Sequence, residues 1–445
     1  MDSVRLNVLV SAHELNPYGG SECAEGWNVI IRLAKYHNLT ILYASGSQFN
    51  PGSYQNGINE YFSKNSNVYN INFIPVEQTK TTLLLAKINR KLSKQKSSIG
   101  NPFLYYLGYS LWQKKAYLVA KILCQRSNFD IIHHLTSISF REPGFLWKLP
   151  IPFIWGPTGG LSRIPFQFYK LIGYGTYFKE LIRSSINNIQ FYSNYRINEA
   201  LKKSALIYTF SIEDQNIFYK KSGKKPKVLL DAATLSSFNG DIEAIDSSKP
   251  LSIVWCGELV KRKSLDILIY AVSRDDQLKS RLKIKIVGSG PLEKYYKQMA
   301  ENLGISNSIE WYGQVNRQTV FNIMNNSDLL VHSSYREATS HVIPEALSHG
   351  LPVICHDING MSIAIDDKCG IKIPLISPET SIEGFKDALL KLINNSLELE
   401  RLKKGAKERS AELSWDVMAE TIALDYISIY NKQIQLANKI PTSYA

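Results

Sequence analysis

The chain has 445 residues, of which 44% are hydrophobic and 20% are charged, and this length favours two domains over a single core. No apolar run approaches the roughly 20 residues of a membrane-spanning helix, and the amino terminus lacks the pattern of a signal peptide. The formal net charge is +13, and most of the excess lies in residues 1–200, which hold 21 Lys and Arg against 10 Asp and Glu. The five cysteines form no CxxC pair, which favours reduced thiols in a cytosol.

Strand-like and helical segments alternate along the chain, and this alternation predicts parallel sheets of the α/β class. In the first half, the predicted strands lie near 4–12, 39–44, 70–75, 130–134, 151–155 and 205–210. In the second half, they lie near 252–256, 283–288, 309–312, 328–333, 352–356 and 371–373. The polar segment 236–250 separates the two sets and is the predicted linker.

A loop with paired glycines, Gly19 and Gly20, follows the first predicted strand and precedes a helical segment over 24–34. Glycines between a strand and a helix allow backbone N–H groups to approach an anion. Gly20 is therefore a candidate binding residue. A tight turn without a ligand explains the same glycines almost as well.

Residues 83–94 combine apolar and basic positions at helical spacing. The apolar positions share one helical face and are Leu84, Leu85, Ile88 and Leu92, whereas the basic positions are Lys87, Arg90, Lys91 and Lys94. This pattern fits a helix that lies on an anionic membrane surface. A solvated basic helix packed on its own domain is an equal alternative, and no nucleic-acid-binding motif accompanies the charge.

The predicted strand over 130–134 ends in two histidines, His133 and His134. Neighbouring side chains of a strand point to opposite faces, so only one of them can face a ligand at the edge of the sheet. We choose His134, and His133 remains the alternative.

Cationic and glycine-rich turns follow the strands of the second half. Strand 252–256 leads into Lys261-Arg262-Lys263, a cluster at a strand-to-helix turn that suits a diphosphate. Strand 283–288 is followed by Gly288-Ser289-Gly290, which lacks the third glycine of a nicotinamide-binding fingerprint.

Two glutamates, Glu337 and Glu345, bracket seven residues between the strand near 328–333 and the next helix. Both are predicted at the carboxyl edge of a parallel sheet, where open α/β sheets bind ligands. Between them, Thr339 and Ser340 offer backbone N–H groups, and their hydroxyls can cap the helix. Pro344 requires this helix to begin late enough to place the proline in its first turn.

The segment from Glu337 to Ile354 resembles the signature of retaining GT-B glycosyltransferases of family 4, the exopolysaccharide, O-antigen and capsule type of group 1. The resemblance implies an α/β fold with two Rossmann-like domains that face a cleft. Residues 1–240 would form the acceptor-side domain and residues 250–414 the nucleotide-sugar domain. Residues 415–445 would form a helix that crosses back onto the first domain.

The resemblance also implies roles for single residues. Glu337 would lie against the transferred sugar as a catalytic residue, and His134 would contact the same sugar. The residues expected to bind the rest of the donor are Gly20, Arg262, Lys263, Gly288, Gly290, Val315, Thr339, Ser340 and Glu345. The family has an arginine where this chain has Glu258, so one phosphate contact depends on Arg262 taking its place.

By this resemblance, we expect transfer of a sugar, with retention, from a UDP- or GDP-linked donor to a saccharide or lipid-linked saccharide in bacterial lipopolysaccharide or capsule synthesis. The chain has no Asp-x-Asp pair, so we expect no metal and no cofactor, with fixed cations and backbone dipoles stabilising the leaving group. We expect a cytoplasmic protein at the inner face of the membrane that binds no nucleic acid. A GT-B epimerase or hydrolase and a non-catalytic GT-B scaffold remain alternatives.

Overall fold

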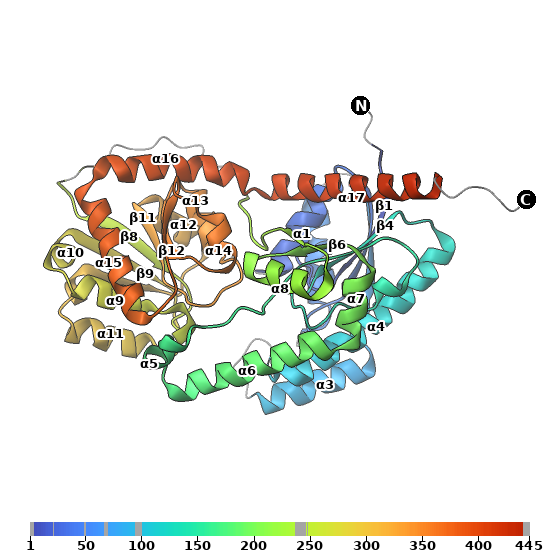
Figure 1. Cartoon of the computed structure of the whole chain (residues 1–445), viewed down its shortest axis with the longest axis horizontal. Coiled ribbons are helices and arrows are strands. Elements are labelled where there is room, and N and C mark those ends of the chain that lie inside the picture. The colour runs from blue at the N-terminus through green and yellow to red at the C-terminus, as the bar shows by residue number, and fades with distance from the viewer. Residues whose placement is uncertain are drawn as a thin grey trace, which may run out of the picture.

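The computed structural model describes residues 4–20, 22–48, 50–65, 70–93, 100–235, 246 and 248–438. These residues form two lobes, each built around one parallel sheet (Figure 1). Most of the predicted linker and Lys94 lie outside the described residues. The predicted α/β architecture with two Rossmann-like domains is confirmed.

The first sheet has seven parallel strands in the order β3-β2-β1-β4-β5-β6-β7. Its strands are β1 (Asn7–Ala12), β2 (Asn38–Ala44), β3 (Ile71–Val76), β4 (Ile131–Thr136), β5 (Phe153–Thr158), β6 (Ser204–Thr209) and β7 (Lys227–Val228). The helices of this half are α1 (Glu22–Leu33), α2 (Ser53–Lys64), α3 (Lys80–Leu92), α4 (Pro102–Arg126), α5 (Tyr169–Ile172), α6 (Tyr174–Ser193), α7 (Tyr195–Lys203) and α8 (Ile212–Ser222). All six predicted strands are present. The sequence missed only β7, which is too short to show a periodic pattern.

The second sheet has six parallel strands in the order β10-β9-β8-β11-β12-β13, and all six were predicted. Its strands are β8 (Leu251–Cys256), β9 (Leu282–Val287), β10 (Ile309–Gly313), β11 (Leu329–His332), β12 (Val353–His356) and β13 (Gly370–Ile373). The helices are α9 (Leu265–Ser273), α10 (Asp276–Arg281), α11 (Glu293–Asn302), α12 (Arg317–Asn325), α13 (Val342–Leu347), α14 (Asn359–Ala364), α15 (Pro378–Asn394), α16 (Ser396–Glu412) and α17 (Trp415–Asn438).

Each sheet reverses its strand order once, and these reversals position the site. In the first sheet the reversal lies between β1 and β4, where Val10 pairs with His133. In the second it lies between β8 and β11, where Leu330 pairs with Val254. Open α/β sheets bind ligands outside the carboxyl ends of the strands at such a point. The loops after β1, β4, β8 and β11 are therefore the expected location of a ligand-binding site.

The C-terminal helix α17 leaves the second lobe and lies along the first (Figure 1). Ser414 caps it, because Val417 N donates to Ser414 Oγ at 3.3 Å. On the first domain, Tyr426 Oη lies 2.6 Å from His133 Nδ1, and Asp416 pairs with Arg32 at 2.9 Å. The two domains are therefore joined by α17 as well as by the chain before β8.

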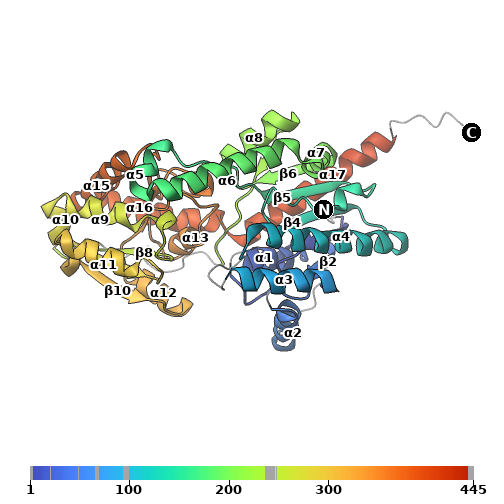
Figure 2. The same ribbon diagram turned by 90° about the horizontal axis from the view of Figure 1, so that it is seen from below.

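A third connection runs along the opposite side of the molecule, through α5 and α6 (Figures 1 and 2). Phe168 and Ile172, just before α6, are buried in the hydrophobic core of the second domain. At the other end of α6, Phe191 is buried against Phe140 and Phe218 of the first domain. Helix α6 thus spans the two lobes, and this placement was not predicted.

None of the helices in the described part of the chain is both long and apolar enough to span a membrane.

Candidate active site

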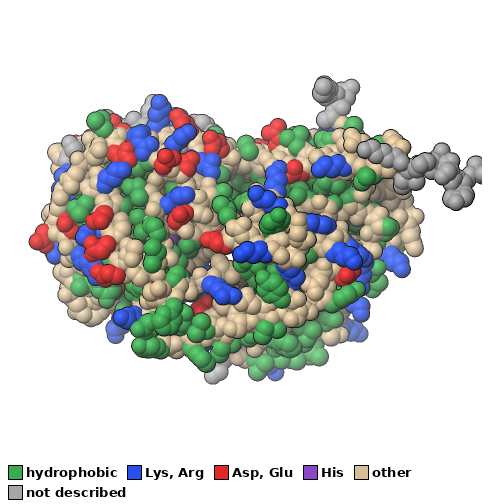
Figure 3. All heavy atoms as spheres, in the orientation of Figure 1, with side chains coloured by type: hydrophobic (Ala, Val, Ile, Leu, Met, Phe, Trp, Pro, Cys, Tyr) green, Lys and Arg blue, Asp and Glu red, His purple; other side chains and the backbone are tan. Residues whose placement is uncertain are grey.

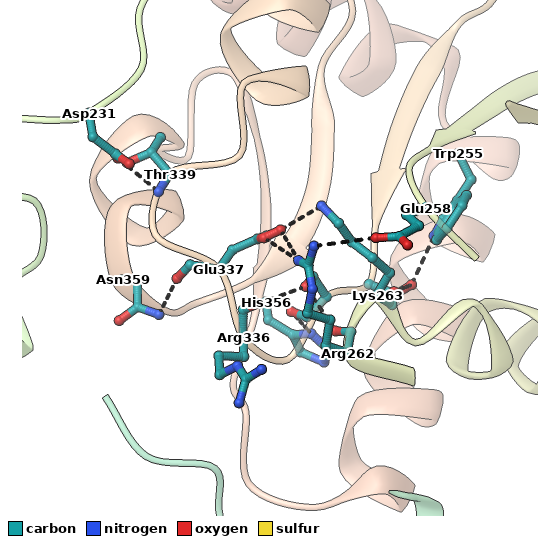
Figure 4. Close-up of polar contacts among 12 residues, drawn as sticks. Asp231, Trp255, Glu258, Arg262, Lys263, Arg336, Glu337, Thr339, His356 and Asn359 are labelled. Carbon is teal, nitrogen blue, oxygen red and sulfur yellow. Dashed lines mark hydrogen bonds and ion pairs between the residues drawn. The ribbon is translucent and has the colours of Figure 1, made fainter. Parts of the chain in front are cut away.

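Glu337 is at the centre of a compact charged cluster in the loops after β8 and β11 (Figure 4). Its carboxylate accepts hydrogen bonds from Arg262 Nη1 at 2.6 and 2.9 Å, and Lys263 Nζ lies 2.6 Å away. The side chains of Glu337 and Lys263 are only 12% and 10% exposed. The structure therefore brings together three of the predicted site residues, with two cations on one carboxylate.

The balance of charge in this cluster keeps Glu337 ionised. Burial raises the pKa of its carboxyl group, but Lys263 and Arg262 outweigh burial, and the pKa lies below its ordinary value. A carboxylate that is buried and ionised beside two cations is available as a fixed negative charge at neutral pH. Conversely, anything that takes the two cations away leaves Glu337 costly to keep charged.

Hydrogen bonds to backbone carbonyl groups hold the two loops in place. Ser334 Oγ donates to Arg262 O at 2.9 Å, and Tyr335 N donates to the same carbonyl at 3.1 Å. Asn359 Nδ2 donates to Glu337 O at 2.5 Å. The cluster is therefore held by a rigid frame, which is what electrostatic preorganisation requires.

Glu258 stands where the resembled family has an arginine, and its side chain is 58% exposed. Its carboxylate lies 3.9 Å from Arg262 Nη2, so it contributes little to the cluster. Arg262 contacts Glu337 directly and so supplies a second cation, which the resembled family would place at the position of Glu258.

Glu345 lies in the first turn of α13, whereas Glu337 lies in the loop before this helix, and Glu345 pairs with Arg317 Nη2 at 2.8 Å. Burial raises the pKa of its carboxyl group, and Arg317 opposes this. The helix begins at Val342, so Pro344 falls in its first turn as predicted. Glu345 is not in contact with Glu337 among the described contacts, and its predicted role stays a prediction.

The structure differs from the prediction for the loop between the glutamates in two respects, and the donor-binding roles of Thr339 and Ser340 stay predictions. The hydroxyls of Thr339 and Ser340 do not cap α13, since its cap position is His341 and no side chain accepts there. The N–H of Thr339 is not free for a phosphate, because it donates to Asp231 Oδ1 at 2.9 Å. Asp231 follows β7 of the first domain, and this contact between the domains was invisible to a local sequence pattern.

Gly288 and Gly290 are explained by packing of the turn after β9. Gly288 has φ +126°, and a Cβ there would lie 2.0 Å from Gly257 O. A Cβ on Gly290 would lie 2.6 Å from Leu259 O. This turn supports the loop that carries Arg262 and Lys263. Val315, the remaining predicted residue of this domain, is half-buried and packs on the core before α12.

Gly20 differs from its neighbour Gly19 in what surrounds it. A Cβ on Gly19 would lie 2.5 Å from Cys23 Cβ, whereas a Cβ on Gly20 would meet no atom within 4 Å. Packing therefore requires Gly19 but not Gly20. The open space beside Gly20 fits its prediction as a binding residue, although no described contact joins it to Glu337.

Neither histidine of β4 has an exposed surface, and both have a pKa lowered by burial, to about 4 for His133 and about 3 for His134. His133 lies between Tyr426 Oη and Gly156 O, each at 2.6 Å. His134 points to the other face, near His13, and neither of its nitrogens has a partner among the described residues. In this structure neither histidine reaches an open surface, and the contact of His134 with a sugar stays a prediction.

Four carboxyl groups that the sequence analysis passed over lie on the first-domain side: Glu14, Glu22, Glu25 and Asp231. Tyr105 Oη donates to Glu14 at 2.9 Å, and Ile138 N donates to Glu22 at 3.2 Å. Burial and mutual repulsion raise the pKa of Glu22 and of Glu25 well above the usual range, and burial raises that of Asp231 to about 6.

The raised pKa values favour the protonated forms of these carboxyl groups, which can donate hydrogen bonds to hydroxyl groups. No group of His, Cys, Asp or Glu within the described ranges has the arrangement to hold a metal ion. Their positions in the sequence could have identified two of them as site residues, because Glu14 follows the first strand and Glu22 is the first residue of the helix after it.

A cavity of about 400 Å³ lies between the two domains beside the Glu337 loop. Arg336, Tyr335 and Asn359 line it from the second domain, and Arg163 and Asn188 line it from the first. The mixture of cationic, amide and aromatic groups suits a small polar ligand such as a sugar.

Residues 241–409 match the family model of glycosyl transferases group 1. The match covers most of the second domain. The matched residues contain the whole Glu337 cluster, so the similarity to this family lies in the part of the chain that carries the site.

Curated proteins of similar sequence match part of the chain. D-inositol 3-phosphate glycosyltransferase of Saccharomonospora viridis is 27% identical over 173 residues, 37% of this chain and 39% of that protein. The lipopolysaccharide glucosyltransferase WaaG of Escherichia coli is 31% identical over 137 residues, 30% of this chain and 35% of WaaG. The chain thus matches less than half the length of either relative.

The fold likeness extends over both domains. The crystal structure of Anabaena HepE in complex with UDP matches with a TM-score of 0.59, covering 95% of this chain and all of that one, at 15% identity. At this identity the likeness shows the shared GT-B fold. The segment that matches the group 1 family therefore lies in the second half of a two-domain GT-B fold.

Proposed function

We propose that this protein is a glycosyltransferase that moves a sugar from a nucleoside diphosphate sugar to a saccharide acceptor, with retention at the anomeric carbon. The observation that carries the proposal is Glu337 held by Arg262 and Lys263 at the reversal point of the second sheet. Two adjacent cations on rigid loops suit a diphosphate, and a fixed carboxylate suits a sugar that becomes positively charged.

In this proposal the ion pairs of the unliganded site exchange partners when the donor binds. The diphosphate takes Arg262 and Lys263, and Glu337 is released to face the sugar. The leaving diphosphate gains negative charge as the bond to the sugar breaks, and the two cations stabilise that charge without a metal ion. Glu337 stabilises the cationic character of the sugar and positions it, and Glu345 holds the ribose.

The acceptor side is formed by the first domain. Burial raises the pKa values of Glu14 and Glu22 and so favours their protonated forms, which can donate hydrogen bonds to acceptor hydroxyls. By resemblance, the donor is UDP- or GDP-linked and the acceptor is a lipid-linked saccharide in bacterial surface polysaccharide synthesis. The enzyme would then work from the cytoplasmic side, at the inner face of the membrane. UDP bound to HepE and the lipopolysaccharide substrate class in the name of WaaG support this choice.

A nucleotide-binding screen followed by product analysis tests the proposal. The purified full chain is scanned for thermal stabilisation by UDP, GDP and their sugars without added metal, since a ligand at 100 times its Kd stabilises by about 2.7 kcal/mol. We expect stabilisation by one nucleotide class and a new glycoside when a saccharide acceptor is supplied. Free sugar or an epimerised donor as the only product would favour a hydrolase or epimerase. Lack of any nucleotide binding would favour a scaffold.

A further inference from the structure

Helices α3, α4 and α6 lie on one side of the molecule (Figure 2), and this side is unusual in charge and in exposed apolar side chains. Residues 80–193, which contain these helices, hold 16 Lys and Arg and only 3 Asp and Glu. The rest of the chain holds equal numbers of the two kinds, so this one segment accounts for the whole net charge of +13. An excess of this size on one segment indicates an anionic partner.

Helix α6 presents an apolar stripe to solvent along most of its length. The stripe consists of side chains between 45% and 76% exposed, at helical spacing: Tyr174, Phe178, Leu181, Ile182, Ile186 and Ile189. The opposite side of α6 faces the protein, since Tyr177 and Phe191 are buried and Glu180 pairs with Arg336 of the second domain. The helix is therefore amphipathic with its apolar side outward, the reverse of an ordinary surface helix.

Helix α3 repeats this arrangement on the same side of the molecule. Leu84, Ile88 and Leu92 are 57%, 40% and 65% exposed, and Lys87 and Lys91 are exposed between them. Figure 3 shows hydrophobic side chains gathered along the lower edge of the molecule, with Lys and Arg beside them. Large contiguous apolar patches are rare on soluble proteins and mark a surface that binds something.

We propose that this surface binds an anionic lipid bilayer, with α6 lying in the plane of the interface. An interfacial helix needs apolar side chains that enter the acyl boundary and basic residues that meet anionic headgroups, and α6 and α3 supply both. A second copy of the chain is a poor occupant, because it would bring two segments of net charge +13 together. A nucleic acid would neutralise the charge but leave the apolar stripe exposed.

This placement has a consequence for the proposed transferase. Glu180, on the inner side of α6, forms an ion pair with Arg336, and Arg336 directly precedes Glu337. A membrane-bound α6 would therefore lie against both domains next to the donor site. The inference deepens the proposed function because it names the surface at which a lipid-linked acceptor would be met.

Vesicle flotation of the full chain tests the surface without any measurement of turnover, so its failure is distinct from failure of the transferase proposal. The probes are vesicles of phosphatidylcholine with 30% phosphatidylglycerol and vesicles of phosphatidylcholine alone. We expect binding to the anionic vesicles that weakens as salt increases. Equal binding to both vesicles, or binding to neither, would overturn the proposal.

Two variants separate the apolar and electrostatic contributions. Replacing Phe178, Ile182 and Ile189 with Ser should weaken flotation on the order of 100-fold, because three side chains no longer enter the interface. Replacing Lys87 and Lys91 with Gln should weaken it about 30-fold, at about 5-fold for each charge near the surface.

The matched control replaces two equally exposed apolar residues outside this surface, Leu397→Ser and Leu424→Ser. We expect it to float like the parent chain. Unchanged flotation of the Phe178, Ile182 and Ile189 variant would overturn the role of α6. So would light scattering that shows a dimer converted by that variant to a monomer, because the stripe would then be a contact between copies.

Discussion

Glu337→Gln separates catalysis from donor binding, because the same carboxylate is proposed to compete with the donor for two cations. The substitution keeps the shape of the side chain and removes its charge. In the parent chain the carboxylate lies 2.6 Å from both Arg262 Nη1 and Lys263 Nζ. A diphosphate must displace these contacts before it can use the two cations itself.

Glu337→Gln should lower stability and turnover but strengthen nucleotide binding. Removing Glu337 leaves Lys263, which is 10% exposed, without its partner, and we expect the unliganded protein to lose about 2 kcal/mol of stability. Arg262 is 34% exposed and is resolvated by water, which limits the loss. Unit charges 4 Å apart interact by about 4 kcal/mol at an effective dielectric constant of 20. If about a third of this interaction energy must be given up when the donor displaces Glu337 from the two cations, the nucleotide should bind about 10-fold more tightly to the variant, which has no such contact to lose.

Turnover should fall by at least about 1000-fold, since the variant cannot stabilise positive charge on the sugar. The assay combines calorimetric titration with the nucleotide that stabilises the parent chain and initial rates of glycoside formation. Glu258→Gln is the matched control, because its carboxylate lies 3.9 Å from Arg262 and is 58% exposed, so both quantities should stay within about 2-fold. Weaker nucleotide binding in Glu337→Gln, in parallel with lost turnover, would refute the exchange of partners.

Three further outcomes are expected. Gly288→Ala should destabilise the protein by at least about 3 kcal/mol, because the new Cβ would lie 2.0 Å from a carbonyl oxygen. Gly20→Ala should leave the unfolding midpoint unchanged, because its Cβ would meet no atom within 4 Å, and should lower the rate of sugar transfer at least about 10-fold. Calorimetry and initial rates check both, and a normal rate for Gly20→Ala would count against a donor contact there. Glu180→Gln should lower the free energy of unfolding by about 1–2 kcal/mol by breaking the contact with Arg336. Glu60→Gln, which loses an exposed pair with Lys64, should leave the midpoint of denaturant unfolding unchanged. Burial raises the pKa of Asp231 to about 6, so the folded state holds the proton of this carboxyl group more tightly than the unfolded chain does. Ionisation of Asp231 therefore lowers the stability of the protein as pH rises from about 4 to about 6. Asp231→Asn should flatten this part of the curve of unfolding midpoint against pH, and an unchanged slope would exclude Asp231 as the source of the pH dependence.

The sequence by itself determined the parts of this protein that depend on short-range order. Twelve strands were predicted because buried parallel strands are continuous apolar runs, and the start of α13 was predicted because proline is tolerated only in a first turn. The grouping of Glu337 with Arg262 and Lys263 was also within reach, since strand ends of one parallel sheet meet at one edge.

Only the tertiary structure decided what depends on contacts between distant segments. It buried His133 under Tyr426 of α17, engaged Thr339 N–H with Asp231, and gathered Glu14, Glu22 and Glu25 into one region of raised pKa. It also turned the apolar side of α6 outward. Helical periodicity shows that a helix has an apolar side, but it does not show which way that side points. In α6 the opposite side packs against both domains, so the apolar side faces outward.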